Sequence, residues 1–89
     1  MSTLTLNVEP IVVDVSVSDD SLHVVLEDGR ELSVPVAWYP RLRAGDPAAR
    51  RNWRLIGRGE GIHWPELDED ISARGLLAGN TEASRPRAA

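Results

Sequence analysis

The segment that decides the fold covers residues 11–36 and reads IVVDVSVSDDSLHVVLEDGRELSVPV. Apolar residues alternate with polar ones in three short runs, which polar turns separate at residues 18–21 and 27–29. Alternation with a period of two, rich in β-branched residues, predicts strands with one buried face. We therefore expect an antiparallel three-stranded meander. In its first strand the alternation assigns the buried face to Ile11, Val13, Val15 and Val17.

The two turns can be tested by parity, because directly opposite residues of an antiparallel pair share a face of the sheet. A four-residue loop at 18–21 sets apolar residues opposite apolar residues. At the second turn a two-residue loop would set them opposite polar residues. A three-residue loop at 27–29, with Gly29 in the left-handed position, instead sets Val24 opposite Leu32. We predict this second register.

After residue 38 the alternation stops and short elements follow. We expect a helical turn opened by Pro40, a helix to about residue 52 with Asp46 as its N-cap, strands at 54–56 and 62–64 around a glycine turn, and a helix over 73–78 between Ser72 and Gly79. The predicted fold class is α+β: a small antiparallel sheet, made of the three-stranded N-terminal meander and a later hairpin, packed by two or three short helices. Residues 1–10 are expected to be an N-terminal extension, 11–79 a single domain and 80–89 a flexible tail.

Composition limits the classes of function. The 89 residues carry ten arginines, no lysine and fourteen acidic residues, which gives a net charge of −4. A chain this short makes one small domain. The absence of cysteine excludes disulfides, thiolate zinc sites and cysteine nucleophiles. An acidic balance argues against a general nucleic-acid binder. The N-terminus has no basic and apolar leader pattern, so we expect a cytoplasmic protein without a membrane segment.

Several stretches together carry a family resemblance. They are residues 29–42 (GRELSVPVAWYPRL), 52–57 (NWRLIG), 59–72 (GEGIHWPELDEDIS) and 75–79 (GLLAG). Over residues 11 to 79 the chain resembles a small bacterial domain family of unknown function, DUF2442. The resemblance implies a compact α+β domain, found alone or ahead of a helix-turn-helix segment. It also implies that lone members are often encoded beside another small protein, in pairs that look like toxin–antitoxin modules. We see no helix-turn-helix pattern after Gly79 and expect no direct binding of nucleic acid.

The acidic run of residues 66–70 is the first candidate for chemistry. Clustered carboxylates suit magnesium or calcium, but the spacing lacks the glycine and distal glutamate of a calcium loop. We therefore favour a surface that recognises a basic partner over a metal site, and expect no cofactor. His23 and His63 could pair with carboxylates in acid–base chemistry. No nucleophile elbow or zinc signature accompanies them, so we predict that the protein is not an enzyme.

The aromatic residues are the second candidate. We expect Trp53 in the core, whereas Trp38 and Trp64, beside prolines at strand ends, fit core and interface equally well. The arginines of residues 41–58 suggest either nucleic-acid contact or solvent-facing helix surfaces, and we favour the second.

These features combine into one functional hypothesis. The chain is predicted to be a non-enzymatic protein-interaction module, an antitoxin-like partner of a small basic protein encoded nearby. The alternative is a sensory or oligomerisation domain related to those of bacterial transcription regulators. In that case the partner could be a second copy of the same chain, in a homo-oligomer. The predicted partner-binding residues are Trp38, Tyr39, Arg41, Trp64, Glu66, Asp68, Glu69 and Asp70.

Overall fold

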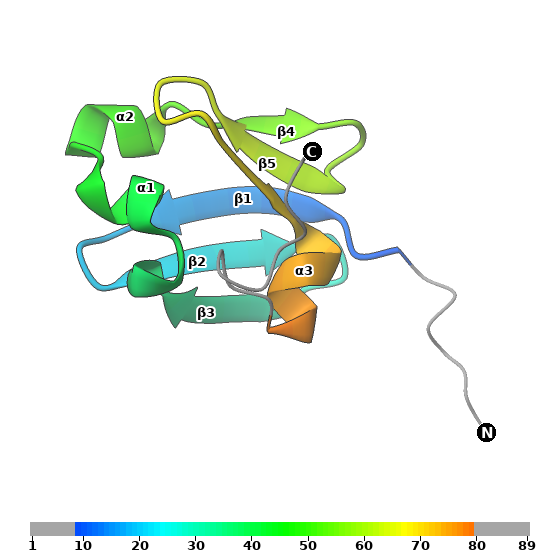
Figure 1. Ribbon diagram of the computed structural model, residues 1–89. Coiled ribbons are helices and arrows are strands. Elements are labelled where there is room, and N and C mark those ends of the chain that lie inside the picture. Colours follow the sequence, from blue (N-terminus) through cyan, green and yellow to red (C-terminus); the bar gives the residue numbers. More distant parts are fainter. Residues whose placement is uncertain (1–8, 80–89) are drawn as a thin grey trace, which may run out of the picture.

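Two antiparallel sheets, each made of three strands consecutive in the sequence, form the body of the molecule in the computed structural model, which describes residues 9–79 (Figure 1). The first sheet contains β1 (Val12–Val17), β2 (Ser21–Leu26) and β3 (Glu31–Pro35), and the second contains β4 (Arg54–Ile56), β5 (Gly61–Trp64) and β6 (Glu69–Ser72). The helices are the 3₁₀ turn η1 (Val36–Trp38), α1 (Pro40–Ala44), α2 (Pro47–Arg51) and α3 (Ala73–Ala78). The predicted α+β class is confirmed.

The registers of the first sheet are those that parity predicts. Val17 lies opposite Leu22 across the first turn, and Val24 lies opposite Leu32 across the second. Gly29 has a φ of 94°, the left-handed conformation that the three-residue turn requires. The alternation of apolar and polar residues in the two hairpins, together with Gly29, therefore predicts the register of this sheet.

The start of β1 departs from the predicted alternation. The register shifts between Val12 and Asp14, which marks a β-bulge. Val12 is buried, whereas the side chain of Val13 is 49% exposed. The assignment of Val13 to the buried face was wrong, because Val13 is the extra residue of the bulge and Val12 takes the buried position in its place.

The second sheet contains one strand more than the sequence predicts. The hairpin of β4 and β5 is confirmed, and its turn places Gly57 and Gly59 at positive φ. β6 then pairs with β5 and sets Glu69 opposite Trp64. The acidic residues 69 and 70, expected on a surface that recognises a basic partner, thus belong to a strand.

The three α-helices begin at the predicted residues, and α3 also ends where predicted, whereas the sequence did not predict η1. The Asp46 side chain accepts a hydrogen bond from the main chain of Ala49, and Ser72 caps α3 in the same way through Gly75. Gly79 ends α3 in the left-handed conformation. The longest helix in residues 9–79 has six residues, and none there could cross a membrane.

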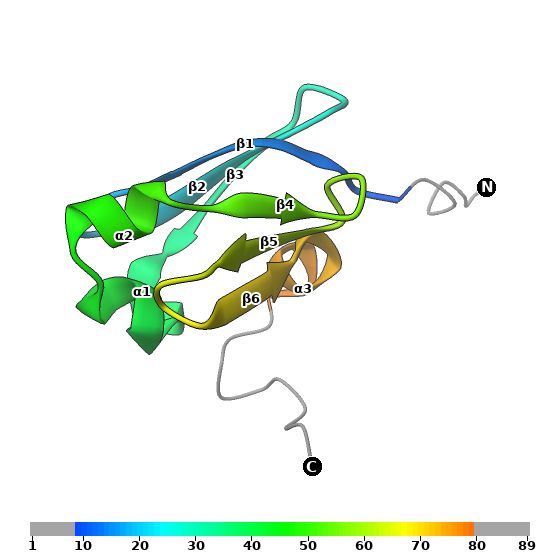
Figure 2. The ribbon, with the colours of Figure 1, turned by 90° about the horizontal axis from the view of Figure 1, so that it is seen from above.

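One core joins both sheets. The strands follow one another in space as β3-β2-β1 and, across an unpaired gap, β4-β5-β6 (Figures 1 and 2). α1 and α2 lie at one end of this curved layer, and α3 lies at the other. The buried side chains of the core include Leu22 and Val24 from the first sheet and Ile62 and Trp64 from the second.

Packing begins at the first described residues. Pro10 is buried, and Glu9 forms an ion pair with Arg74, so residues 9 and 10 of the predicted N-terminal extension contact the domain. The remainder of that extension and the predicted flexible tail, residues 80–89, lie outside the described residues.

Candidate interaction surface

The predicted partner-binding residues separate into a buried group and an exposed group. Tyr39 and Glu69 are each 1% exposed, and Trp64 is 0% exposed. These three residues cannot contact a partner on the folded surface, so their assignment to the interface was wrong. Burial of Trp64 also settles the alternative that the sequence left open, in favour of the core. Trp38 is partly buried and packs against the same core.

Trp64 is buried with its polar atom satisfied. Its indole Nε1–H donates to the main-chain oxygen of Arg50 at 3.0 Å. The indole therefore joins β5 to α2 by a hydrogen bond as well as by its large apolar surface. Trp53, expected in the core, is only partly buried and packs against its edge.

Glu69 is buried because β6 turns its side chain toward the inside of the second sheet. The Arg41 guanidinium lies above it, with Nη1 4.0 Å from the Glu69 carboxylate. The same nitrogen donates to the main-chain oxygen of Asp68 at 2.6 Å. Arg41 is exposed and closes the turn between β5 and β6 from the outside.

The exposed carboxylates of the acidic run already have partners inside the molecule. Asn52 donates to the Glu66 carboxylate at 2.7 Å, and His63 lies within hydrogen-bond distance of Asp70. Arg41 approaches the Asp68 carboxylate at 3.9 Å. Among residues 9–79 there is no group of three or more histidines and carboxylates that could hold a metal ion.

A larger acidic surface lies on the first sheet and its turns. β1, β2, β3 and their connections carry six exposed carboxylates and a single arginine, Arg30, which already pairs with Asp28. The carboxylates are those of Asp14, Asp19, Asp20, Glu27, Asp28 and Glu31. We call this set the sheet-1 carboxylates. The sequence does not reveal them as one surface, because they are scattered along the chain and come together only when the meander folds.

His23 occupies the middle of this surface. Its ring nitrogens lie 2.8 Å from the Ser33 hydroxyl and 3.0 Å from the Glu31 carboxylate. Ser33 is its direct register partner on β3, and Glu31 is two residues away on the same face. Neighbouring strands bring such side chains together as a matter of course, and this contact serves to stabilise the sheet.

Among residues 9–79, Arg50 is the one buried arginine. Its Nε donates to the main-chain oxygen of Leu42 at 2.9 Å, and Nη2 donates to that of Arg43 at 2.8 Å. Nη1 donates to the Asp19 carboxylate at 2.8 Å. The guanidinium thereby satisfies carbonyls at the end of α1 and ties them to the first turn. The expectation that the α2 arginines all face solvent was wrong for Arg50 and holds for Arg51.

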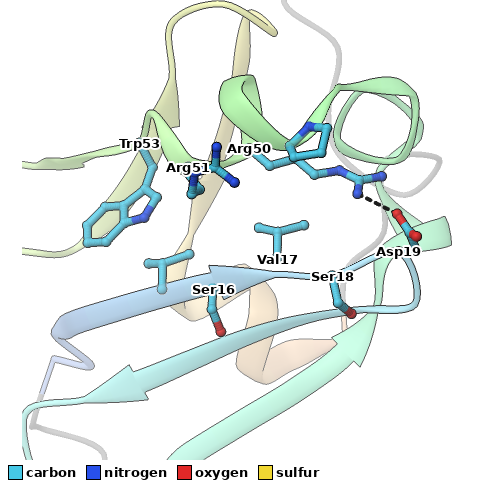
Figure 3. A pocket seen from close by; sticks show the side chains of 9 residues that line it. Ser16, Val17, Ser18, Asp19, Arg50, Arg51 and Trp53 are labelled. Carbon is cyan, nitrogen blue, oxygen red and sulfur yellow. Dashed lines mark hydrogen bonds and ion pairs between the residues drawn. The ribbon is translucent and has the colours of Figure 1, made fainter.

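A cavity of about 680 Å³ opens between β1 and α2. Figure 3 shows Val17 on one side of it, Trp53 and Arg51 on the other, and the Arg50–Asp19 pair at its end. At the opposite end the Val12 N–H bonds to the Gly59 oxygen at 2.8 Å and joins β1 to the β4–β5 turn. We call this cavity the β1–β4 groove, and its lining residues are Val15, Ser16, Val17, Ser18, Asp19, Pro47, Arg50, Arg51 and Trp53.

The edge of β1 that borders the groove carries unpaired main-chain groups. Ser18 N–H donates to the Ser21 oxygen at 2.9 Å, and such bonds recur at every second residue of an antiparallel ladder. Ser16 therefore pairs with β2, whereas the N–H and C=O groups of Val15 and Val17 point away from it. Consistently, Val15 N–H is bonded to the side chain of Asp14 at 2.9 Å.

Exposed apolar side chains lie on β1 and on β4. Of the four large hydrophobic residues exposed in residues 9–79, Val13 lies on β1, and Leu55 and Ile56 lie on β4. An edge strand with apolar side chains is a ready template for pairing with another chain, but none of these three residues lines the β1–β4 groove. The sequence could not locate the groove, because it depends on how closely α2 and Trp53 approach β1.

Two carboxyl groups have pKa values shifted by arginine. The side-chain hydrogen bond from Arg74 holds the pKa of Glu9 below its ordinary value. The main-chain N–H of Arg30, followed by its guanidinium, lowers the pKa of Asp28. Both are surface pairs that remain charged at neutral pH.

Comparison with known proteins adds a family and one solved relative. The model of the family described as "Protein of unknown function (DUF2442)" matches residues 12–82. The crystal structure of a protein of unknown function from Rhodospirillum rubrum is similar, with 29% sequence identity and a TM-score of 0.71. The match covers 84% of this chain and 95% of that one. No curated protein matches the sequence.

Proposed function

Because this chain belongs to the DUF2442 family of proteins of unknown function, we propose its function from its own surface: it is a non-enzymatic protein-interaction module, the antitoxin-like partner of a small basic protein encoded nearby. Such a module needs complementary charge and an anchoring surface, and it needs no reactive group. We place the pair in the cytoplasm, since a chain without cysteine needs no oxidising compartment.

The observation that carries this proposal is the arrangement of the sheet-1 carboxylates. These six carboxylates lie on one face of the first sheet and in its turns, where the strands and turns carry a single arginine. Asp20 and Glu27 lie at opposite ends of that face, in the connection before β2 and in the one after it. Arg30 pairs with Asp28 and Arg50 pairs with Asp19, and the remaining four carboxylates leave the surface with a net negative charge. This charge accelerates encounter with a basic protein and selects against acidic partners.

The test is co-purification of the tagged chain with the small basic protein encoded next to it, followed by titration calorimetry at low and at high salt. We expect a complex whose affinity falls as salt rises, because the attraction is between exposed charges. Failure of the two proteins to associate at low salt would refute the proposal.

Charge reversal locates the surface. The double variant D20K/E27K is expected to weaken binding about tenfold or more. The matched control D68K/D70K also reverses two exposed carboxylates, but it places them beside the second sheet, and we expect a smaller loss. Equal losses in the two variants would show that net charge alone governs binding.

The alternative role, a sensory or oligomerisation domain, is favoured by the exposed apolar residues Val13, Leu55 and Ile56 on unpaired strand edges. Light scattering across a range of concentrations distinguishes it, since this role predicts a stable homo-oligomer without the basic protein. A mobility-shift assay on the chain's own promoter, with and without the partner, tests whether either species contacts DNA.

A further inference from the structure

The β1–β4 groove combines three features that an extended peptide requires. It offers main-chain groups along β1 that no neighbouring strand pairs, an apolar lining and open space of about 680 Å³. The Val12–Gly59 hydrogen bond closes one end of the gap between the sheets. Toward α2 the two sheets are not bonded to each other, so the sheet that began at β3 stops at β1 although more strands follow in space.

We propose that an extended segment of the basic partner adds to β1 as a fourth strand of the first sheet and fills this groove. The inference rests on the proposed function, because the segment belongs to that partner. Addition of a strand to an exposed sheet edge is a recurrent mode of peptide recognition, in which main-chain bonds supply affinity and alternate side chains supply specificity.

Main-chain geometry determines where the segment binds. Val15 and Val17 direct their N–H and C=O groups away from β2, so an added strand can bond to both residues. The other edge of this sheet is less suitable, since Pro35 in β3 has no N–H to donate. The edge of β1 is therefore the one that accepts a regular ladder.

Side chains of the segment alternate between two environments. Those that face inward meet Val15, Val17 and Trp53, which requires apolar residues at every second position. Trp53 is partly buried at the edge of the core, and a bound segment would cover its exposed face. A large aromatic ring that a ligand covers is a frequent source of binding energy.

Two charged side chains, Asp14 next to the lining residue Val15 and Arg51 in the lining itself, define the remaining positions. Asp14 currently uses its carboxylate to bond the Val15 N–H at 2.9 Å. A strand that takes over this N–H frees the carboxylate for a lysine or arginine of the segment. At the α2 end Arg51 is exposed on the rim and favours an acidic or carbonyl acceptor. The segment thus carries alternating apolar residues with a basic residue near Asp14.

The first test compares two lysine substitutions on β1. V17K places a charge in the groove, and such inward-pointing charges block strand addition. V13K is the matched control: the same change on the same strand, at a residue that is already exposed and does not line the groove. We expect V17K to weaken binding of the adjacently encoded basic protein at least tenfold and V13K to change it less than threefold. Thermal unfolding of both variants verifies that they are folded.

The second test uses the unmodified chain and so does not depend on a variant folding. Amide hydrogen exchange is measured with and without the basic protein. We expect exchange at Val17 to slow at least tenfold on binding. Ser16 is the internal control, because its amide is already within the β1–β2 ladder and is expected to change little.

The outcomes separate this inference from the proposed function. A complex that forms normally, with V17K equal to V13K and no protection of Val17, overturns the groove assignment and leaves the proposed function standing. Absence of any complex overturns both. Protection of Val17 that rises with the concentration of the chain alone shows that a second copy occupies the groove, which also overturns the proposal.

Discussion

Replacement of Arg50 by methionine tests whether one buried guanidinium holds the short helices α1 and α2 together. R50M keeps a long unbranched side chain and removes three hydrogen bonds. The bond to Asp19 contributes little, because that carboxylate is 94% exposed to water. The bonds to the carbonyls of Leu42 and Arg43 are made by a charged donor, and each contributes roughly 1.5 kcal/mol or more.

The expected loss for R50M is therefore about 3 kcal/mol in the free energy of unfolding. A small domain has about 5–15 kcal/mol in total, so the variant should lose a large share of its stability. For a chain of this size the thermal midpoint should fall by more than roughly 10 °C.

Urea unfolding followed by fluorescence of the three tryptophans measures this change. R51M is the matched control, the neighbouring arginine on the same helix. It is exposed, and we expect its effect to stay within about 0.5 kcal/mol. A loss below about 1 kcal/mol for R50M, or equal losses in the two variants, would refute the reasoning.

Two further predictions concern single contacts. G59A should lower the free energy of unfolding in urea by more than about 1 kcal/mol, because φ at Gly59 is +108° and an added Cβ would lie 2.6 Å from the Val12 oxygen. G29A is the control: Gly29 also has a positive φ, but an added Cβ there would meet no atom within 4 Å, so the loss should be smaller. A larger loss for G29A than for G59A would contradict the argument from the Val12 contact. The hydrogen bond from Arg74 lowers the pKa of Glu9, so this pair stabilises the fold at neutral pH, and its contribution is lost as the pH falls through the lowered pKa. Carbon-detected NMR titration should find the Glu9 pKa below that of the R74M variant, and identical values would exclude the pair in solution.

Local patterns were sufficient for most of the fold. Alternation and turn parity predict the registers of the first sheet, because opposite residues must share a face and only one loop length satisfies this at Gly29. Capping chemistry at Asp46 and Ser72 predicts where the helices begin. These signals act over a few residues and can be read without knowledge of the tertiary structure.

What the sequence could not show depends on contacts between distant elements. Val13 keeps the apolar alternation in the sequence, yet the bulge exposes it. Glu69 reads as part of a solvated acidic run, but pairing with β5 turns it inward opposite Trp64. Arg50 and Arg51 are identical neighbours in the sequence, and only the packing of α2 against α1 distinguishes the buried one from the exposed one.

The same limit applies to the candidate site. The sequence placed a partner surface on residues 38–41 and 64–70, where the structure finds core residues and carboxylates that already have partners. The sheet-1 carboxylates and the β1–β4 groove arise from residues scattered along the meander and from the approach of α2. Only the position of β1 as the first strand, and hence an edge of its sheet, was available in advance.

Because each sheet consists of strands that are neighbours in the sequence, the order of folding follows from the architecture. Both ladders close over short loops, so we expect them to form early and fast. Contacts that link the halves span much longer separations, 31 residues for Asp19–Arg50 and 65 for Glu9–Arg74. Docking of the halves should then be the late step, and fragments cut between α1 and α2 should reassemble when mixed.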